Sequence, residues 1–150
     1  IVMKTYAGYI NLKPINGVIF PSYAQNQINR NYIVNNLKGQ FFLSTNENTY
    51  GKNNIILRSL LEEKGIKGIS LLSIFSLPKI KKDRIYIYKL ALKYKKELHF
   101  VFEEKKFKKK NDIEKIEDFL IFNEPFFTQK KTNLTSFEKK YFLDKKWTFV

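Results

Sequence analysis

The feature that most constrains this chain is a repeated alternation of short apolar runs with segments of helical periodicity. The apolar runs predict four strands, at residues 5–12, 40–45, 68–75 and 97–103. The segments that follow them repeat apolar residues at helical spacing, which predicts helices at 23–37, 54–64, 79–96 and 112–122. Such alternation is typical of βαβ units, which build a parallel sheet. We therefore expect an α/β fold of three layers, with a four- to five-stranded, mainly parallel sheet flanked by helices.

Turn and cap residues mark the ends of several elements. Ser22, with Gln25 three residues later, fits a capping box at the start of the first helix. Asp112 fits the N-cap of the last helix, and the run Lys105–Lys110 is most simply a solvated loop. The strand at 97–103 holds His99, which we interpret as a core histidine rather than a catalyst.

The chain divides into a domain and an arm. Its 150 residues fit one domain, but the strand–helix rhythm ends near residue 122. The remaining segment is aromatic and basic, and so many aromatic residues argue against disorder. We expect residues 1–122 to form the α/β domain and residues 123–150 to form a C-terminal arm. The arm would pack on the domain or on a second subunit of a homodimer.

Several classes of site are excluded by composition. The chain has no cysteine, which excludes disulfides and thiolate metal sites and fits a reducing cytoplasm. With one histidine, a zinc site is not expected. The first residues carry no apolar core of a signal peptide, and no run is long and apolar enough to cross a membrane. Glycine-rich dinucleotide and P-loop motifs are absent, so we expect no cofactor. Taken with the cysteine and histidine counts and the missing signal peptide, we also expect no metal and a cytoplasmic protein.

The charge of +14 has two interpretations. It could serve an anionic partner such as nucleic acid. Lysine outnumbers arginine by 25 to 3, however, and proteins that read bases rely on the planar fork of arginine. We therefore favour a compositional bias over a nucleic-acid partner.

The candidate site lies beyond the carboxyl ends of the strands, where parallel sheets bind ligands. Glu47 and Glu103 are the acid–base candidates, because both would face this edge, although either could equally be a solvated carboxylate. The expected ligand-binding residues are polar and come from the strand-end loops and the first helix: Asn11, Lys13, Asn16, Gln25, Asn26, Arg30, Ser73 and Ser76. Amides, hydroxyls and carboxylates suit a sugar or sugar phosphate, whose hydroxyl groups need paired donors and acceptors.

The order of elements resembles the catalytic domain of serine recombinases, the resolvases. The matching pieces are Gly8-Tyr9-Ile10, the helix with Gln25, and the turn after Ser73. The nucleophilic serine and the phosphate-binding arginines of that family are missing from this chain, which has Asn11-Leu12-Lys13-Pro14 and Phe75-Ser76-Leu77-Pro78 at the matching places. The resemblance therefore implies a resolvase-like or flavodoxin-like fold without DNA strand transfer.

A second resemblance covers roughly residues 8–120. The chain resembles the sporadic carbohydrate cluster family, small proteins encoded among sugar-modification and surface-polysaccharide genes. The segments that carry it share an order along the chain: Gly8-Tyr9-Ile10, Lys13-Pro14, Gln25-Asn26, Ser73-Ile74-Phe75-Ser76-Leu77-Pro78, Leu98-His99-Phe100 and Asp112-Ile113. Lys13 stands where the family pattern has arginine, so the charge is kept but the bidentate geometry is lost. The resemblance implies a carbohydrate pathway and no particular reaction.

Three functions follow as expectations. We favour a small protein of such a pathway that binds or converts a sugar or nucleotide-sugar intermediate, with proton transfer as the chemistry if it is an enzyme. The first alternative is a non-catalytic partner or regulator that acts through the C-terminal arm. The second is a nucleic-acid-binding domain on a recombinase-like frame.

Overall fold

The computed structural model describes residues 2–47 and 54–132, and for residues 124–132 it describes the backbone alone. Its strands are β1 (Thr5–Ile10), β2 (Gln40–Asn46), β3 (Gly68–Leu71), β4 (Glu97–Phe100) and β5 (Lys105–Phe107). Its α-helices are α1 (Ser22–Asn31), α2 (Ile55–Glu62), α3 (Lys81–Lys93) and α4 (Asn111–Thr132), with a π-helical turn η1 (Tyr32–Asn36) and a 3-10 turn η2 (Ile74–Ser76).

The strands form one sheet in the order β2-β1-β3-β4-β5. β1, β2, β3 and β4 run parallel, and β5 pairs antiparallel with β4. The prediction of an α/β fold with a mainly parallel sheet flanked by helices is confirmed, with five strands. β1 lies between β2 and β3. The strand that follows β1 in sequence, β2, is therefore added on one side of it, and β3 is added on the other side. This reversal places the topological switch point at the carboxyl ends of β1 and β3.

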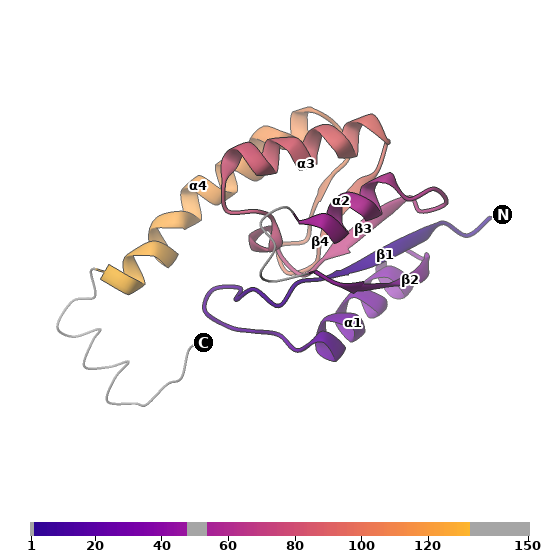
Figure 1. Ribbon diagram of the computed structural model, residues 1–150, viewed down its shortest axis with the longest axis horizontal. Helices are drawn as coiled ribbons and strands as arrows, with labels where there is room; N and C mark the ends of the chain where they lie inside the picture. The colour runs from indigo at the N-terminus through magenta and orange to yellow at the C-terminus, as the bar shows by residue number, and fades with distance from the viewer. Residues whose placement is uncertain (1, 48–53, 133–150) are drawn as a thin grey trace.

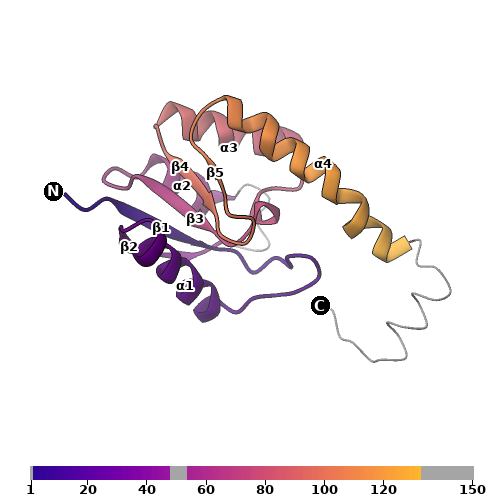
Figure 2. The same cartoon turned by 180° about the vertical axis from the view of Figure 1, so that it is seen from behind.

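The helices cover the two faces of the sheet unequally. α1 lies on one face, and α2, α3 and α4 lie on the other (Figures 1 and 2). The main apolar core lies under α2, α3 and α4, and its sheet residues alternate along the strands, as a strand with period two requires: Ala7, Tyr9, Ile69, Leu71, Leu98 and Phe100. The three-layer arrangement that we expected therefore has its large core on one side.

The face under α1 is more polar. Asn29 of α1 is fully buried, donates to the Tyr9 carbonyl at 3.1 Å and accepts from Ser70 Oγ at 2.8 Å. α1 approaches the sheet closely at Gly8, where an added Cβ would lie 3.1 Å from the Asn29 Cβ and 2.7 Å from Cε2 of Phe41. Hydrogen bonds to the strands thus replace part of the apolar packing on this side.

Three predicted strands are shorter in the structure, and the first of them, β1, ends at Ile10 rather than at residue 12. β3 ends at Leu71, and Ile74–Ser76 form η2 instead of continuing the strand to residue 75. β4 ends at Phe100, and the chain turns back to form β5 from part of the run that we predicted as a solvated loop. β5 forms because Phe107 is fully buried and stacks on Tyr88 at 5.2 Å between ring centroids.

The helix ends also differ from the predictions. The capping box is wrong: α1 follows Pro21 and has no side-chain cap, because Ser22 accepts from Asn46 and Gln25 bonds the backbone of Asn11. α1 closes in the π-helical turn η1, where the Leu37 N–H bonds the Tyr32 carbonyl at 3.1 Å.

At the last helix, α4 begins at Asn111, so Asp112 lies inside it rather than at its N-cap. The Asp112 carboxylate accepts from the N–H groups of Lys108 and Lys109, which come before the helix. α4 continues beyond the predicted end at 122 to Thr132. Residues 133–150, the rest of the predicted arm, lie outside the described residues. Within the described part of the chain, no helix is both long enough and apolar enough to cross a membrane.

Candidate functional site

The carboxyl ends of β1, β2, β3 and β4 lie at one edge of the sheet, because these strands are parallel. This edge carries Asn11, Glu47, Ser73 and Glu103. The Glu47 N–H bonds the Ile10 carbonyl at 2.8 Å, which holds the end of β2 beside the end of β1. The strand-end placement assumed for the candidate site is therefore present, and its ligand chemistry stays a prediction.

Glu47 is buried and holds the start of α2. Its carboxylate accepts from the N–H groups of Ile56 and Leu57 at 3.1 and 3.0 Å, and from the Tyr9 hydroxyl at 2.9 Å. Burial, followed by the Glu47 carboxylate, raises the pKa of Tyr9, so this hydroxyl stays protonated and donates. A carboxylate at a helix N-terminus satisfies N–H groups that the helix leaves unpaired. Glu47 thus has a structural role at the site where we predicted an acid–base catalyst.

Glu103 holds the next turn in a similar way. It accepts from Ser73 Oγ at 2.6 Å and from the Ile74 N–H at 2.7 Å. Ser73 Oγ in turn accepts from the Phe75 N–H at 3.1 Å, so both side chains fix the start of η2. The structure therefore brings Ser73 and Glu103 together, as predicted from their strand ends, and the bonds join the turn after β4 to the segment after β3.

The amide of Gln25 ties α1 to the loop after β1. Its Oε1 accepts from the Asn11 N–H at 3.1 Å, and its Nε2 donates to the carbonyls of Asn11 and Phe20, both at 2.8 Å. Asn11 Oδ1 accepts from the Lys13 N–H at 2.9 Å, which turns the loop. Gln25 and Asn11 are buried and shape this corner of the sheet.

The other predicted ligand-binding residues are spread around this corner. The guanidinium of Arg30 lies 5.8 Å from the centroid of the Phe41 ring, on the β2 side of α1. Asn26 lies one turn before Arg30 on α1, and its Oδ1 is buried with no hydrogen-bond partner among the described residues. Asn16 is an exposed turn residue with a left-handed backbone, and Ser76 is buried in η2.

A hollow of about 260 Å³ lies beside this edge, between α1 and the turn from β4 to β5. We call it the α1 hollow. Its lining joins residues from three segments: Ile28, Asn31, Tyr32, Asn36, Val101 and Glu104. Burial, followed by the nearby Glu104 carboxylate, raises the pKa of Tyr32, so the tyrosine is a neutral hydroxyl. None of the ten residues predicted for the site lines this hollow.

Behind the α1 hollow, His99 contacts Tyr32, one of the residues that line it. The Tyr32 ring contacts the imidazole of His99 at 6.0 Å between centroids, and the Tyr6 ring meets it edge-on at 5.6 Å. His99 Nε2 lies 2.9 Å from Oε1 of Glu97, and its Nδ1 is buried without a partner among the described residues. Burial lowers the pKa of His99, against the opposing effect of Glu97. His99 is thus a core histidine, as interpreted, but one ring nitrogen is unsatisfied.

Positive charge lies close to the same face. Lys67 and Lys108 each place Nζ 3.8 Å from Oε2 of Glu97. Lys108 and Lys106 also help to lower the pKa of His99. The carboxylate of Glu97 therefore interacts with two lysines and with His99. This region favours anions over cations.

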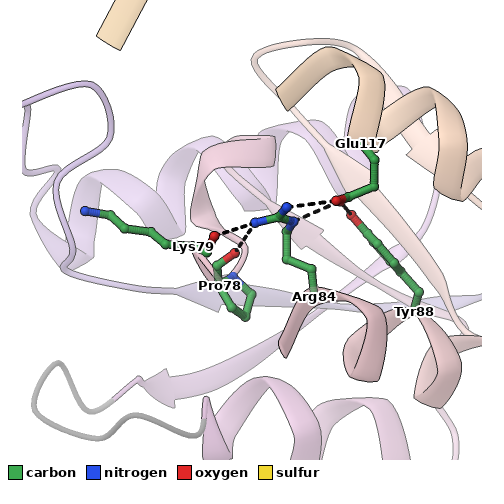
Figure 3. A network of polar contacts seen from close by, with 5 residues as sticks. All are labelled: Pro78, Lys79, Arg84, Tyr88 and Glu117. Carbon is green, nitrogen blue, oxygen red and sulfur yellow. Dashed lines mark hydrogen bonds and ion pairs between the residues drawn. The ribbon is translucent and has the colours of Figure 1, made fainter. Parts of the chain in front are cut away.

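A second polar network joins α3 and α4 on the face of the sheet opposite α1. Arg84 of α3 forms a two-point ion pair with Glu117 of α4, with both N···O distances at 2.8 Å, and Tyr88 donates to the same carboxylate at 2.7 Å (Figure 3). The guanidinium also donates to the carbonyls of Pro78 and Lys79 at the start of α3. Figure 3 shows the guanidinium held between the turn and α4, which is a structural role.

Sequence reasoning missed most of the α1 hollow. Asn31 and Asn36 lie where the change from α1 to η1 rotates the side chains, and no periodic pattern reports a π-helical turn. Glu104 lies near the end of the fourth predicted strand. In the structure it has a left-handed backbone in the turn from β4 into β5, and the sequence did not predict β5. Among the described residues, no group of three or more histidine, aspartate or glutamate side chains could hold a metal ion.

Comparison of the chain with protein-family models, with curated proteins and with solved structures found no match in any of the three.

Proposed function

We propose that this protein binds a sugar or sugar phosphate in the α1 hollow. The observation that carries the proposal is the lining of the hollow, which combines two amides, a carboxylate and a tyrosine with two aliphatic side chains. Sugar hydroxyl groups need both donors and acceptors, and amides supply both. The resemblance to a carbohydrate-associated family points to the same class of ligand and to a sugar-modification pathway.

The chemistry of the lining fits the two sides of a sugar ring. Asn31 and Asn36 can donate to and accept from hydroxyl groups, and Glu104 can accept only. Ile28, Val101 and the ring of Tyr32 offer apolar surface to the C–H groups of the ring. A volume of about 260 Å³ matches a small ligand such as a monosaccharide rather than a polymer.

A phosphate on the sugar would gain from the charge of this face. The charges of Lys106 and Lys108 help to lower the pKa of His99, and the His99 ring contacts the ring of Tyr32, which lines the hollow. A phosphate that replaces part of the role of Glu97 as the counter-ion of Lys108 would bind more tightly at low salt. We therefore expect sugar phosphates to bind better than the matching neutral sugars.

Binding without conversion is the form of the proposal that the contacts support. Both predicted acid–base residues, Glu47 and Glu103, accept backbone N–H groups at the starts of α2 and η2. A proton-transfer role would require either carboxylate to leave these donors, at a cost of about 1–3 kcal/mol per unsatisfied group. Turnover of a sugar by this chain is therefore not part of the proposal.

The test is a titration of the isotope-labelled full chain with neutral monosaccharides and their phosphates, followed by two-dimensional NMR. We expect shifts of the amide signals of Asn31, Tyr32 and Glu104. Glu104→Gln should weaken binding by about tenfold, because a charged acceptor is lost. The matched control is Glu62→Gln, which changes an exposed carboxylate at the end of α2 and should leave the affinity unchanged.

Two results would contradict the proposal. One is the absence of shifts with every sugar and sugar phosphate at millimolar concentration. The other is binding that Glu104→Gln and Glu62→Gln weaken equally, because the ligand would then not depend on the α1 hollow.

A further inference from the structure

A second hollow lies on the other side of the sheet, on the solvent side of α3. Its volume is about 480 Å³, and we call it the α3 groove. It is lined by Lys81, Lys82, Ile85, Tyr86 and Lys89. α3 and α1 cover opposite faces of the sheet, so the α3 groove is separate from the α1 hollow (Figures 1 and 2).

The α3 groove combines an apolar floor with a cationic rim. Ile85 and Tyr86 supply the apolar part, and the three lysines are exposed. None of the described residues that line it is acidic. A groove of this composition complements a ligand that carries both negative charge and flat or apolar groups.

Tyr86 is held in place from the neighbouring helix. The guanidinium carbon of Arg58, on α2, lies 4.8 Å from the centroid of the Tyr86 ring, and Arg58 Nη2 is 3.4 Å from its hydroxyl. Tyr86 is nevertheless 46% exposed, so part of its surface remains accessible to a ligand. A fixed, partly exposed aromatic ring beside cations is the arrangement on which nucleic-acid bases stack.

The spacing along α3 places a cation on each side of this ring. Lys82 precedes Tyr86 by four residues and Lys89 follows it by three, which puts all three side chains on one face of the helix. The rise of an α-helix separates Lys82 from Lys89 by about 10 Å along the axis. Lysine side chains at that separation can reach the phosphates on either side of one stacked base.

We propose that the α3 groove binds single-stranded nucleic acid without sequence preference. Lys81, Lys82 and Lys89 would contact phosphates, and Tyr86 would stack on a base. Lysine suits this role because phosphate contact needs charge, whereas base reading needs the arginine fork. An acidic peptide would satisfy the lysines but would make no use of the exposed tyrosine ring, so the ring favours nucleic acid. The inference is independent of sugar binding.

The test measures fluorescence anisotropy of a labelled oligothymidylate and a labelled oligouridylate, each of about 12 nucleotides, with the full chain. Affinity should fall with salt, and the slope of log affinity against log salt should be about −2 for three phosphate contacts on a single strand. The two oligonucleotides should bind alike. A homopolymer of glutamate of similar charge is the competitor that represents an acidic protein partner.

Charge reversal separates the α3 groove from the general charge of the chain. The triple variant Lys81→Glu, Lys82→Glu and Lys89→Glu should weaken binding by about a hundredfold and flatten the salt slope. The matched control reverses three exposed lysines outside the groove and changes the net charge equally: Lys4→Glu, Lys38→Glu and Lys64→Glu. It should weaken binding far less.

The tyrosine is tested in the same way. Tyr86→Ala should weaken binding by about tenfold through loss of stacking, and Tyr86→Trp should restore it. The control Tyr23→Ala removes a tyrosine that is 74% exposed on α1 and should have no effect. Equal losses in both lysine triples, or no binding at low salt, would overturn the proposal. Binding of polyglutamate that depends on Tyr86 to the same degree would replace it with an acidic protein partner.

Discussion

The hydroxyl of Tyr9 donates a hydrogen bond of 2.9 Å to Oε2 of Glu47. Tyr9 belongs to the core face of β1, and Glu47 follows the last residue of β2 and accepts the first N–H groups of α2. One buried carboxylate therefore links a central strand, an edge strand and a helix. These hydrogen bonds explain how an ionisable group can be buried at the candidate site.

Removal of the Glu47 carboxylate should destabilise the fold. In Glu47→Ala, the N–H groups of Ile56 and Leu57 and the Tyr9 hydroxyl all lose their acceptor, so we expect the free energy of unfolding to fall by about 2–3 kcal/mol. Urea denaturation followed by circular dichroism measures the change. Glu62→Ala, on the exposed end of α2, should stay within about 0.5 kcal/mol of the unaltered protein. Equal stability of Glu47→Ala and the unaltered chain would contradict the structural role.

The ion pair between Arg84 and Glu117 should make stability depend on acid pH. Burial alone would raise the pKa of Glu117, but hydrogen bonds from Arg84 and Tyr88 outweigh it and hold this pKa below its usual value of 4.5. The unfolded chain therefore takes up a proton at higher pH than the folded one, so the stabilisation is present above about pH 4.5 and is lost as the pH falls below it.

The variant Glu117→Gln isolates this effect. It should lower the free energy of unfolding at neutral pH by about 3 kcal/mol, because the Arg84 guanidinium loses its counter-ion in a site only 12% exposed. The loss relative to the unaltered protein should shrink below about pH 4, as protonation removes the ion pair there too. Urea denaturation at several pH values measures both, and a loss that stays constant with pH would contradict the assignment.

His99 should produce a second pH dependence, nearer neutrality. Burial lowers its pKa below 6.5, even though Glu97 acts in the opposite direction. Between the two pKa values the unfolded chain binds a proton that the folded chain does not, so stability should be full above about pH 7 and should decrease as the pH falls through 6.5. Because the chain has a single histidine, His99→Gln should flatten the profile between about pH 7 and pH 5.5. An unchanged slope in that variant would show that other groups are responsible.

Gly68 should not tolerate a side chain. A Cβ at this position would lie 2.5 Å from the carbonyl oxygen of Glu97 and 2.9 Å from its Cβ, on the neighbouring strand β4. The two strands cannot separate easily, because the Glu97 N–H bonds the Lys67 carbonyl at 3.1 Å. Gly68→Ala should therefore lower the free energy of unfolding by about 2 kcal/mol or more.

A second glycine provides the control for that experiment. Gly65 has a left-handed φ of +88° and nothing within 4 Å of an added Cβ. Asparagine accepts a left-handed backbone at small cost, so Gly65→Asn should change stability by less than about 1 kcal/mol. Thermal and urea denaturation measure the stability of both variants. Gly68→Ala tests the effect of a steric conflict, and Gly65→Asn tests the effect of backbone conformation alone. A larger loss in Gly65→Asn than in Gly68→Ala would contradict the packing argument.

The edge of the candidate site was predictable, and its bonding was not. Glu47 and Glu103 could be assigned to strand ends because apolar runs fix where strands stop, and parallel strands end at one edge. That each carboxylate would bond the N–H groups of a following turn depends on how α2 and η2 dock on the sheet. Such docking brings together groups distant in sequence, and no local spacing reports it.

What the sequence by itself determined is the architecture: the alternation of apolar runs with helical segments is a local pattern, and a parallel sheet is the solution that buries it. What only the tertiary structure decided is β5 and the α1 hollow. β5 exists because Phe107 packs on Tyr88, and the α1 hollow exists because residues 28–36 meet residues 101–104. Backbone periodicity depends on neighbours along the chain, whereas side-chain burial depends on the whole fold, and therefore β5 and the α1 hollow follow from contacts that only folding creates.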